Sequence, residues 1–171
     1  VGGTKEGDIV SIQKPNGAAN QKWIIQPRGD GWFWLMPTSQ PGLALTVDGA
    51  GTKNGTKLIL AKDTKSDAQL WSITKNDNGS YSMEPKHAPG MGIDHLGGKK
   101  EVGAKIDLWQ HNKNDSHLQW FIRPLAGSGI AEAKKDDEPK YTPPKTSWGA
   151  PDIGGMFSTA SLTSMTRPAG A

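Results

Sequence analysis

Cysteine is absent from this chain, which excludes disulfides and thiolate metal sites. No apolar run approaches membrane-spanning length and no signal peptide stands at residue 1, so we expect no membrane span. The net charge of +3 is small and dispersed, which argues against nucleic acid as a partner. Helical periodicity is also missing between residues 24 and 120. The chain therefore does not resemble a helical, membrane-spanning or nucleic-acid-binding protein.

Turn-forming residues and tryptophan are abundant instead. The sequence has 22 glycines, 12 prolines and seven tryptophans, but only three phenylalanines. This composition is typical of a turn-rich β domain whose core depends on tryptophan.

Three tryptophans mark a sequence repeat. Trp23, Trp71 and Trp120 are spaced by 48 and 49 residues. Glutamine stands two places before the first two, as Gln21 and Gln69, whereas in the third copy it directly precedes the tryptophan. Glycines, a proline and alternating apolar residues keep the same register, as in Gly42 with Gly90, Gly55 with Gly103, Pro37 with Pro85, Leu58 with Ile106 and Leu60 with Leu108.

Each full copy predicts four short strands separated by turns, because apolar residues alternate in pairs between Gly, Pro and Asn clusters. Three such copies predict an all-β fold, a β-trefoil over residues 1–124, with the three tryptophans buried on a common axis. The first copy is incomplete at the N-terminus, because Val1 aligns with Leu96 in the middle of the third. We expect either that the natural protein continues upstream or that another segment fills this gap.

Residues 125–171 change in character and predict an extended, irregular C-terminal tail rich in Gly, Pro, Ser and Thr. Two roles are open for it. Gly155 to Thr159 resembles Gly90 to Asp94, so the tail could complete the broken lobe. Its apolar residues could instead anchor it on a protein partner or larger assembly, the role we favour; these are Trp148, Ile153, Met156, Phe157 and Leu162.

Over residues 1–124 the chain resembles the ricin B-type, Gln-x-Trp β-trefoil lectins. The resemblance is carried by Gln21-Lys22-Trp23, Gln69-Leu70-Trp71, Leu118-Gln119-Trp120 and residues 54–60. It implies a non-catalytic carbohydrate-binding module for a galactose-type sugar, with no cofactor and with an extracellular or secreted location favoured. The alternative is a structural subunit that uses a degenerate trefoil as a scaffold and docks through its tail.

In the family, an aspartate on the second strand and an aromatic platform hold one sugar per lobe. A carboxylate accepts hydrogen bonds from two hydroxyls, and an indole covers the apolar face of a pyranose. Only the third lobe keeps these residues, as Asp94 and Trp109, followed by Asn112, with His117 where the family usually has asparagine. The middle lobe has Thr46 and Ala61 at these two positions, and the first has Gln13 as platform.

Simpler roles stand beside these. Trp109 could be a surface or interface aromatic, Asp94 could cap a turn, and Asn112 and His117 could be solvated loop residues. His87, His95 and His111 show no metal-ligand spacing. Asn54, Asn78 and Asn114 open Asn-x-Ser/Thr sequons, which are possible N-glycosylation sites. No paired carboxylates or nucleophile beside a base are evident, so no enzyme is predicted.

Overall fold

The computed structural model describes residues 4–95, 101–112 and 115–125, together with the backbone of residues 162–166. These residues form the strands β1 (Lys22–Pro27), β2 (Phe33–Pro37), β3 (Ala44–Val47), β4 (Thr56–Ala61), β5 (Trp71–Lys75), β6 (Tyr81–Pro85), β7 (Met91–His95), β8 (Ile106–Gln110), β9 (Phe121–Pro124) and β10 (Leu162–Thr166). The helical turns are the short 3-10 segments η1 (Ala19–Gln21), η2 (Asp48–Ala50), η3 (Asp67–Gln69) and η5 (Ser116–Leu118). In this described part of the chain, no helix is long and apolar enough to cross a membrane.

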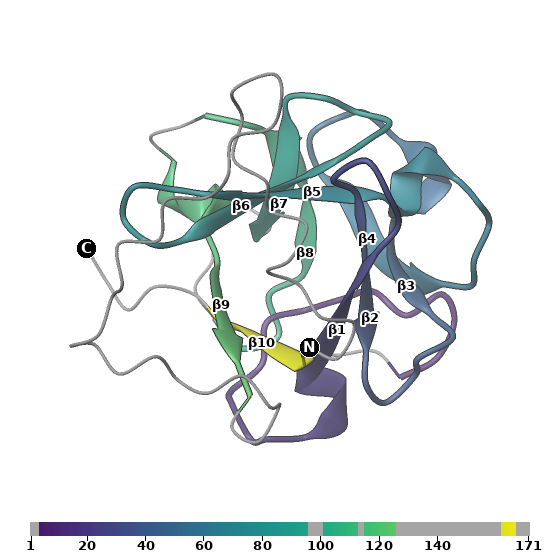
Figure 1. The fold of residues 1–171 in the computed structure, drawn as a ribbon, viewed down its shortest axis with the longest axis vertical. Coiled ribbons are helices and arrows are strands. Elements are labelled where there is room, and N and C mark those ends of the chain that lie inside the picture. Colours follow the sequence, from purple (N-terminus) through teal and green to yellow (C-terminus); the bar gives the residue numbers. More distant parts are fainter. Residues whose placement is uncertain (1–3, 96–100, 113–114, 126–161, 167–171) are drawn as a thin grey trace, which may run out of the picture.

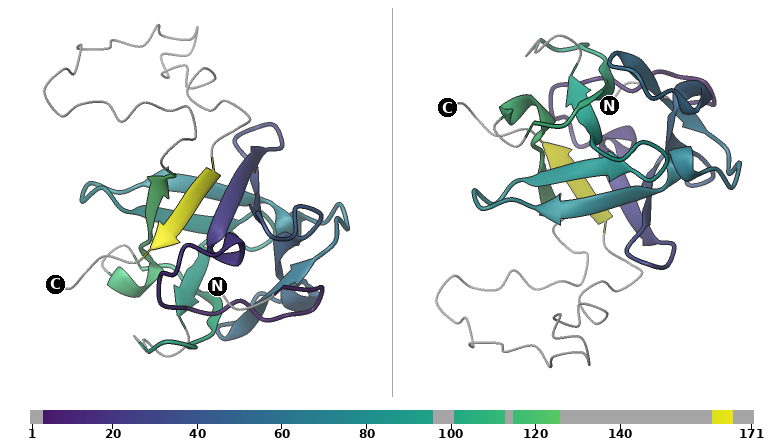
Figure 2. Two further views of the ribbon diagram at one scale, coloured as in Figure 1. Left: turned by 90° about the horizontal axis from the view of Figure 1, so that it is seen from below. Right: turned by 90° about the horizontal axis from the view of Figure 1, so that it is seen from above.

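Six strands form a barrel in the order β6-β5-β2-β1-β10-β9. A bridge between Tyr81 and Trp120 joins β6 to β9 and closes the ring. Figure 1 shows β1, β9 and β10 beside one another in this ring, and Figure 2 shows the same neighbours from two further sides.

The other four strands form a second sheet in the order β3-β4-β8-β7. Residues 9–12 of the first lobe join this sheet by two bridges, from Ile9 to Ile59 on β4 and from Ser11 to Lys105 just before β8. One segment from each lobe therefore meets at the centre of the sheet, as the threefold repeat predicts.

The pairing register of the barrel strands repeats in each of the three lobes, and β10 follows the same register. Antiparallel neighbours β1 and β2 are joined by residues 28–32, and β5 and β6 by residues 76–80, whereas β9 and β10 are separated by residues 125–161. Each lobe's first strand nevertheless pairs with its two neighbours at equivalent residues. These are Phe33 with Pro27 and Trp71, Tyr81 with Lys75 and Trp120, and Thr163 with Pro124 and Trp23.

β10 therefore occupies the first-strand position of the incomplete lobe. Part of the segment predicted as an irregular tail belongs to the barrel, and residues 162–166 pair with their own chain rather than with a partner. The strand lies a few residues beyond the segment that we predicted for this purpose. Gly155 to Thr159 themselves lie outside the described residues, as does the rest of the tail from residue 126 to residue 161.

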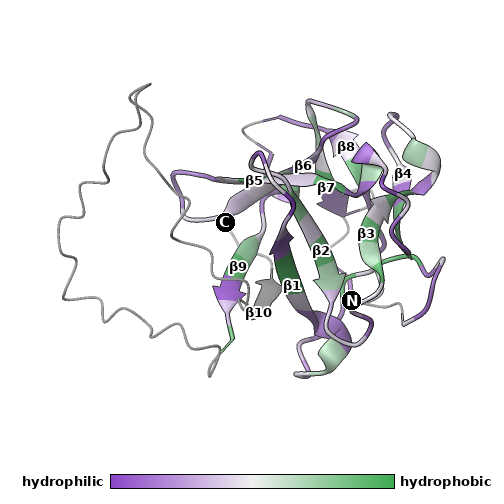
Figure 3. Ribbon diagram, turned by 45° about the vertical axis from the view of Figure 1, so that its right-hand side comes forward, coloured by the Kyte–Doolittle hydropathy of each residue, from purple (hydrophilic) through white to green (hydrophobic). Residues whose placement is uncertain are grey.

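The core is apolar and centred on the repeat tryptophans. Trp23 and Trp71 are completely buried and Trp120 is 8% exposed, as predicted. Aliphatic side chains from all three lobes pack with them, among them Val10, Leu35, Leu45, Leu58, Leu60, Met83, Ile93, Ile106 and Leu108. Figure 3 shows hydrophobic colour on parts of β1, β2, β3 and β9 and hydrophilic colour in many of the turns. No lobe buries its apolar side alone, so the three stabilise one another.

Candidate functional site

Two of the predicted site residues, Asp94 and Trp109, lie on one face of the β7–β8 hairpin. Asp94 pairs with Asp107, and Gly92 pairs with Trp109. Because residues directly opposite in an antiparallel pair share a face, and alternate residues along a strand share it too, Asp94 and Trp109 lie diagonally on the same face. Ile93 and Leu108, between them, point into the core.

Asp94 and Trp109 differ in their access to solvent. The Trp109 side chain is among the large hydrophobic residues left exposed, at 37%, although its neighbours Leu108 and Ile106 are buried. Asp94 is only 5% exposed. An exposed indole beside a recessed carboxylate is the arrangement expected for a ring platform with a hydroxyl acceptor at its edge.

Asp107 is the residue that sequence reasoning missed. Strand alternation places it on the face opposite the core residues Ile106 and Leu108, yet it is only 2% exposed. Neither carboxyl oxygen has a hydrogen bond from another residue in the described part of the chain. Burial raises the pKa of this carboxyl to about 7, and the charge of Asp94 adds to the increase. The only signal in the sequence was its register with Asp94.

The rim of the site comes from the segment after β8. The Asp115 carboxylate accepts the backbone N–H of His117 at 2.9 Å and lies 3.1 Å from the Nδ1 atom of the same residue. The His117 ring centre lies 4.8 Å from that of His95, the neighbour of Asp94. The exposed Asn112 is placed at the other end of this turn, because its carbonyl accepts the Asp115 N–H at 2.9 Å. The hairpin register thus brings Asp94 and Trp109 together, whereas Asn112 and His117 lie in the turn and the 3-10 segment η5 that follow β8.

The equivalent face of the second lobe is used for packing. Thr46 stands where the third lobe has Asp94, and its hydroxyl accepts a hydrogen bond from the buried Gln69 side chain at 3.0 Å. Ala61 stands where the third lobe has Trp109 and pairs with Ala44. In the first lobe, the side chain of Gln13 donates to Ser11. Among the residues that the structure describes, neither face places a carboxylate beside an aromatic ring.

The slipped glutamine of the third lobe has a structural consequence. Gln21 and Gln69 each tie the loop before them, donating to the carbonyls of Lys14 and Lys62 at 2.7 Å. In the third lobe the buried Leu118 takes this position, two residues before the tryptophan. Gln119 turns instead to the β5–β6 turn, where it accepts from Asn78 at 2.8 Å. Among the described residues, the loop beside the candidate site is held by the hydrogen bonds of Asp115.

Two of the three sequons have structural roles for their asparagines. Asn54 is exposed, and its side-chain oxygen accepts the backbone N–H of Gln110 at 2.8 Å. The Asn78 amide nitrogen, the atom that a glycan would modify, donates to Gln119. Asn114 lies outside the described residues. Glycosylation at these positions remains a prediction.

The histidines occupy separate environments. His111 lies 3.7 Å from Glu84, His87 contacts the Gly51 carbonyl at 3.1 Å, and His95 is buried against His117. Within the residues that the structure describes, no three His, Asp or Glu side chains gather as a metal site would require.

A family model for ricin-type β-trefoil lectin domain-like proteins matches residues 1–61 and, in a second overlapping copy, residues 38–109. The chain belongs to this family. The two overlapping matches reflect the internal repeat, since one model can align with successive pairs of lobes. Among curated protein sequences, none matches the chain.

Solved structures share the fold. A designed threefold-symmetric protein, ThreeFoil, is 26% identical with a TM-score of 0.65, over 69% of this chain and 82% of that one. A mosquitocidal holotoxin is 25% identical with a TM-score of 0.62, over 69% of this chain but only 14% of the toxin. A Polyporus squamosus lectin bound to a sialylated epitope is 21% identical with a TM-score of 0.50, over 60% of this chain and 36% of the lectin. The last likeness concerns the fold alone.

Proposed function

We propose that this domain is a non-catalytic carbohydrate-binding module with one sugar site, in the third lobe. The observation that carries the proposal is the diagonal placement of Asp94 and the exposed Trp109 on one face of β7 and β8. A pyranose stacked on the indole directs its ring hydroxyls toward the recessed carboxylate. Asn112 and His117, in the segment after β8, are the further residues that we propose for contacts with substituents of the ring. A galactose-type sugar is the ligand that the family resemblance favours.

Asp107 bears on the kind of sugar. Two carboxyl groups that face one another in a buried position disfavour an anionic saccharide, because its charge would add to the repulsion. With a pKa of about 7, Asp107 carries a proton part of the time at neutral pH, so it can donate a hydrogen bond where Asp94 accepts one. The pair therefore suits the hydroxyls of a neutral sugar.

The same pair does not suit hydrolysis. Glycosidases place their two carboxyl groups on either side of the bond to be broken, in an open cleft. Asp94 and Asp107 are instead opposite residues of one hairpin, 5% and 2% exposed, so they do not stand on either side of an open cleft. We therefore infer a binding role for this site.

A single shallow site of this kind binds with a dissociation constant of about 1 mM, or about −4 kcal/mol. Retention on a glycan-bearing surface then needs several copies, provided by an assembly or by a longer parent chain.

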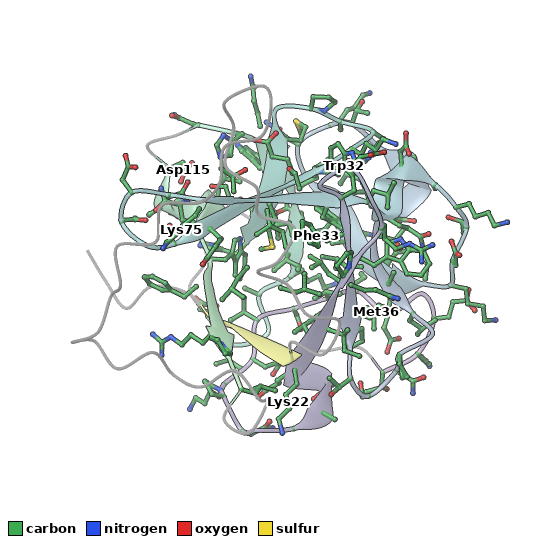
Figure 4. The ribbon with its side chains drawn as sticks, in the orientation of Figure 1. Lys22, Trp32, Phe33, Met36, Lys75 and Asp115 are labelled. Carbon is green, nitrogen blue, oxygen red and sulfur yellow. The ribbon has the colours of Figure 1, made fainter. Side chains whose placement is uncertain are left out.

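The test is glycan binding by Trp109→Ala and Asp94→Asn, measured by titration with neutral mono- and disaccharides. Both variants should lose at least tenfold in affinity while their thermal unfolding stays close to that of the parent chain, because Trp109 is exposed and asparagine matches aspartate in shape. Trp32→Ala is the matched control, since Trp32 is another partly exposed indole and lies well away from Asp115 at the site's rim (Figure 4). Undiminished binding in both site variants would exclude this site.

The assembly role stays a second proposal. Because residues 162–166 belong to the barrel, a deletion of the whole tail would confuse assembly with folding. The informative variant removes residues 126–160 and leaves β10 in place. Loss of assembly with an intact fold would support docking through this segment.

A further inference from the structure

The hairpin of β1 and β2 carries a cluster of aromatic and cationic side chains that the third-lobe site does not use. The backbone N–H of Arg28 donates to the Trp32 carbonyl at 2.8 Å, and Gln26 pairs with Trp34. Opposite residues of an antiparallel pair share a face, as do alternate residues along a strand, so Arg28, Trp32 and Trp34 lie on one face of the hairpin. Leu35, on the other face, is fully buried in the core. The cluster therefore stands on the outer face of the barrel.

Arg28 is held in place by one of these rings. Its guanidinium carbon lies 3.8 Å from the centre of the Trp34 ring, well within the range of a cation–π contact. The ring covers one side of the guanidinium, so the N–H donors that do not contact it are available to a planar acceptor such as a carboxylate. Arg28 takes no part in the ion pairs of the described residues, which use the cations Lys62, Lys86, His111 and His117. Its charge is thus positioned without being neutralised by an ion pair within the described part of the chain.

Trp32 lies beside a second cation. The Lys86 ammonium, just after β6, is 5.8 Å from the centre of the Trp32 ring, and Asp67 holds it in an ion pair at 3.0 Å. The Trp32 indole is partly exposed, so it offers a flat apolar surface that the C–H groups of a pyranose can cover. Because Asp67 already neutralises Lys86, the charge available to a ligand of this face is that of Arg28.

The repeat shows that the fold does not require large side chains at these positions. The three residues have equivalents 48 positions later in the third lobe, Asn76, Ser80 and Ser82. The turn there has the same backbone hydrogen bond, from the Asn76 N–H to the Ser80 carbonyl at 2.8 Å. The Asn76 amide also donates to the hydroxyls of both serines, at 3.0 and 3.1 Å, and both serines are buried. The same hairpin is thus closed by small polar residues in the third lobe, whereas in the second it presents two indoles and a guanidinium.

The surroundings of the hairpin limit what can bind to it. β2 pairs with both β1 and β5, and β1 pairs with both β2 and β10, so neither strand has a free edge to which a peptide strand could add. Trp32 and Trp34 are each only partly exposed. Partly covered rings suit a flat ligand that stacks on them better than insertion into a lipid interface. A saccharide is therefore the favoured occupant.

We propose that the outer face of the β1–β2 hairpin is a second saccharide site, specific for an acidic sugar, in which the pyranose ring stacks on Trp32 and a uronate carboxylate pairs with the Arg28 guanidinium. The planar fork of an arginine matches the two oxygens of a carboxylate. Trp32 and Trp34, which holds the guanidinium, are alternate residues roughly 7 Å apart, a span that one pyranose and its carboxylate substituent can bridge.

This site differs from the third-lobe site in its preference for charge. In the third lobe, Asp94 and Asp107 are opposite residues of one hairpin and disfavour an anionic ligand. On the β1–β2 hairpin, a carboxylate gains a charge-assisted hydrogen bond from Arg28 instead. The two sites share no residue, so either can fail a test while the other stands.

The probe is a trimer of galacturonate, and its fully methyl-esterified form is the matched neutral control. Each is added to the ¹⁵N-labelled 171-residue chain at up to millimolar concentration, and the indole N–H resonances are followed. The Trp32 and Trp34 resonances should shift and saturate with the acid trimer. The ester should bind there about tenfold more weakly or not at all, because it cannot accept a charge-assisted hydrogen bond. Unmoved Trp32 and Trp34 resonances, or an ester that binds there as well as the acid, would overturn the proposal.

Substitutions of the cation separate a specific contact from general attraction. Arg28→Gln should weaken binding of the acid trimer about tenfold. Arg28→Lys, which keeps the charge but loses the planar fork, should bind more weakly than the parent chain. Lys22→Gln is the matched control, because it removes the same charge from a residue that lies well away from Trp32 (Figure 4). Equal losses in Arg28→Gln and Lys22→Gln would mean that net charge alone attracts the trimer, and would overturn the proposal.

Crossed variants and two further probes distinguish this site from the alternatives. Trp32→Ala should abolish binding of the acid trimer, whereas Trp109→Ala should leave it unchanged; the reverse is expected for the neutral sugars of the third-lobe site. A hexaglutamate peptide that binds as tightly as the trimer and depends equally on Arg28 would replace the saccharide by an acidic peptide. Binding to phosphatidylserine vesicles that depends on Arg28, without binding of the trimer, would replace it by a membrane surface.

Discussion

Asp107 has an unusual environment: its carboxyl group is buried on a strand opposite a second aspartate, Asp94. Neither of its oxygens accepts a hydrogen bond from another residue in the described part of the molecule. Its pKa of about 7 means that the folded chain keeps a proton that the unfolded chain releases near pH 4. The folded state therefore binds more protons than the unfolded state between these two values. Stability from this group is complete below about pH 4 and is lost as pH rises to about 7.

The prediction is a stability that falls with pH in this window. The free energy of unfolding should decrease by up to about 1.4 kcal/mol per pH unit between pH 5 and 7 and then level off. Asp107→Asn, which mimics the protonated carboxyl, should remove this slope and be more stable than the parent chain at pH 8. Urea unfolding at several pH values measures both, and Asp115→Asn, in an accessible turn, serves as the control. An unchanged slope in Asp107→Asn would show that another group is responsible.

Asp94 and Trp109, by contrast, are residues whose site roles remain a prediction. The family resemblance indicated them, and the hairpin register brings them onto one face. Two features shape the loop next to them. The buried Leu118 stands where the other lobes have a loop-binding glutamine, and Asp115 holds His117 beside His95.

At the scale of the secondary-structure elements, the lobes differ in whether a second strand offers a carbonyl acceptor to the tryptophan that closes the lobe. β3 and β7 satisfy the indole donors of Trp71 and Trp120, whereas Trp23 has no such acceptor in the described residues. The tryptophan that closes each lobe thus packs in the core in all three lobes, and in the second and third lobes it also donates a hydrogen bond to its own lobe.

This difference predicts unequal costs for the same substitution. Trp→Phe leaves a similar small cavity in each lobe, but in the second lobe it also strands the buried Leu45 carbonyl. Trp71→Phe should therefore destabilise the chain by about 1–3 kcal/mol more than Trp23→Phe, as measured by urea unfolding. Equal losses would mean that the Trp23 indole is hydrogen-bonded in solution.

For the whole molecule, closure of the barrel depends on a strand far along the chain. β10 separates β1 from β9, and without it both would expose unpaired edges. Residues 125–161 connect β9 to β10, whereas the other equivalent neighbours are joined by short turns. Closing this longer loop therefore costs more chain entropy.

Two substitutions test this closure. Ser164→Pro should destabilise the fold, because Ser164 is paired on both sides, with Lys22 and with Arg123, and proline cannot donate in a central strand. Replacing residues 125–161 by a turn of the length used at residues 28–32 should stabilise it by roughly 1–2 kcal/mol through a smaller loop-closure entropy. Thermal unfolding measures both effects. A Ser164→Pro chain with unaltered unfolding would show that β10 does not close the barrel in solution.

The amino-acid sequence by itself determined the threefold repeat, the all-β trefoil and the burial of Trp23, Trp71 and Trp120, because period-two alternation, turn residues and a repeated tryptophan are local signals that recur three times. It also indicated Asp94 and Trp109. The tertiary structure alone decided where β10 pairs, that Asp107 is buried against Asp94, and that the Trp23 indole has no acceptor among the described residues. Each of these depends on which strand lies alongside another, and hydrogen bonds between distant segments leave no pattern within either one.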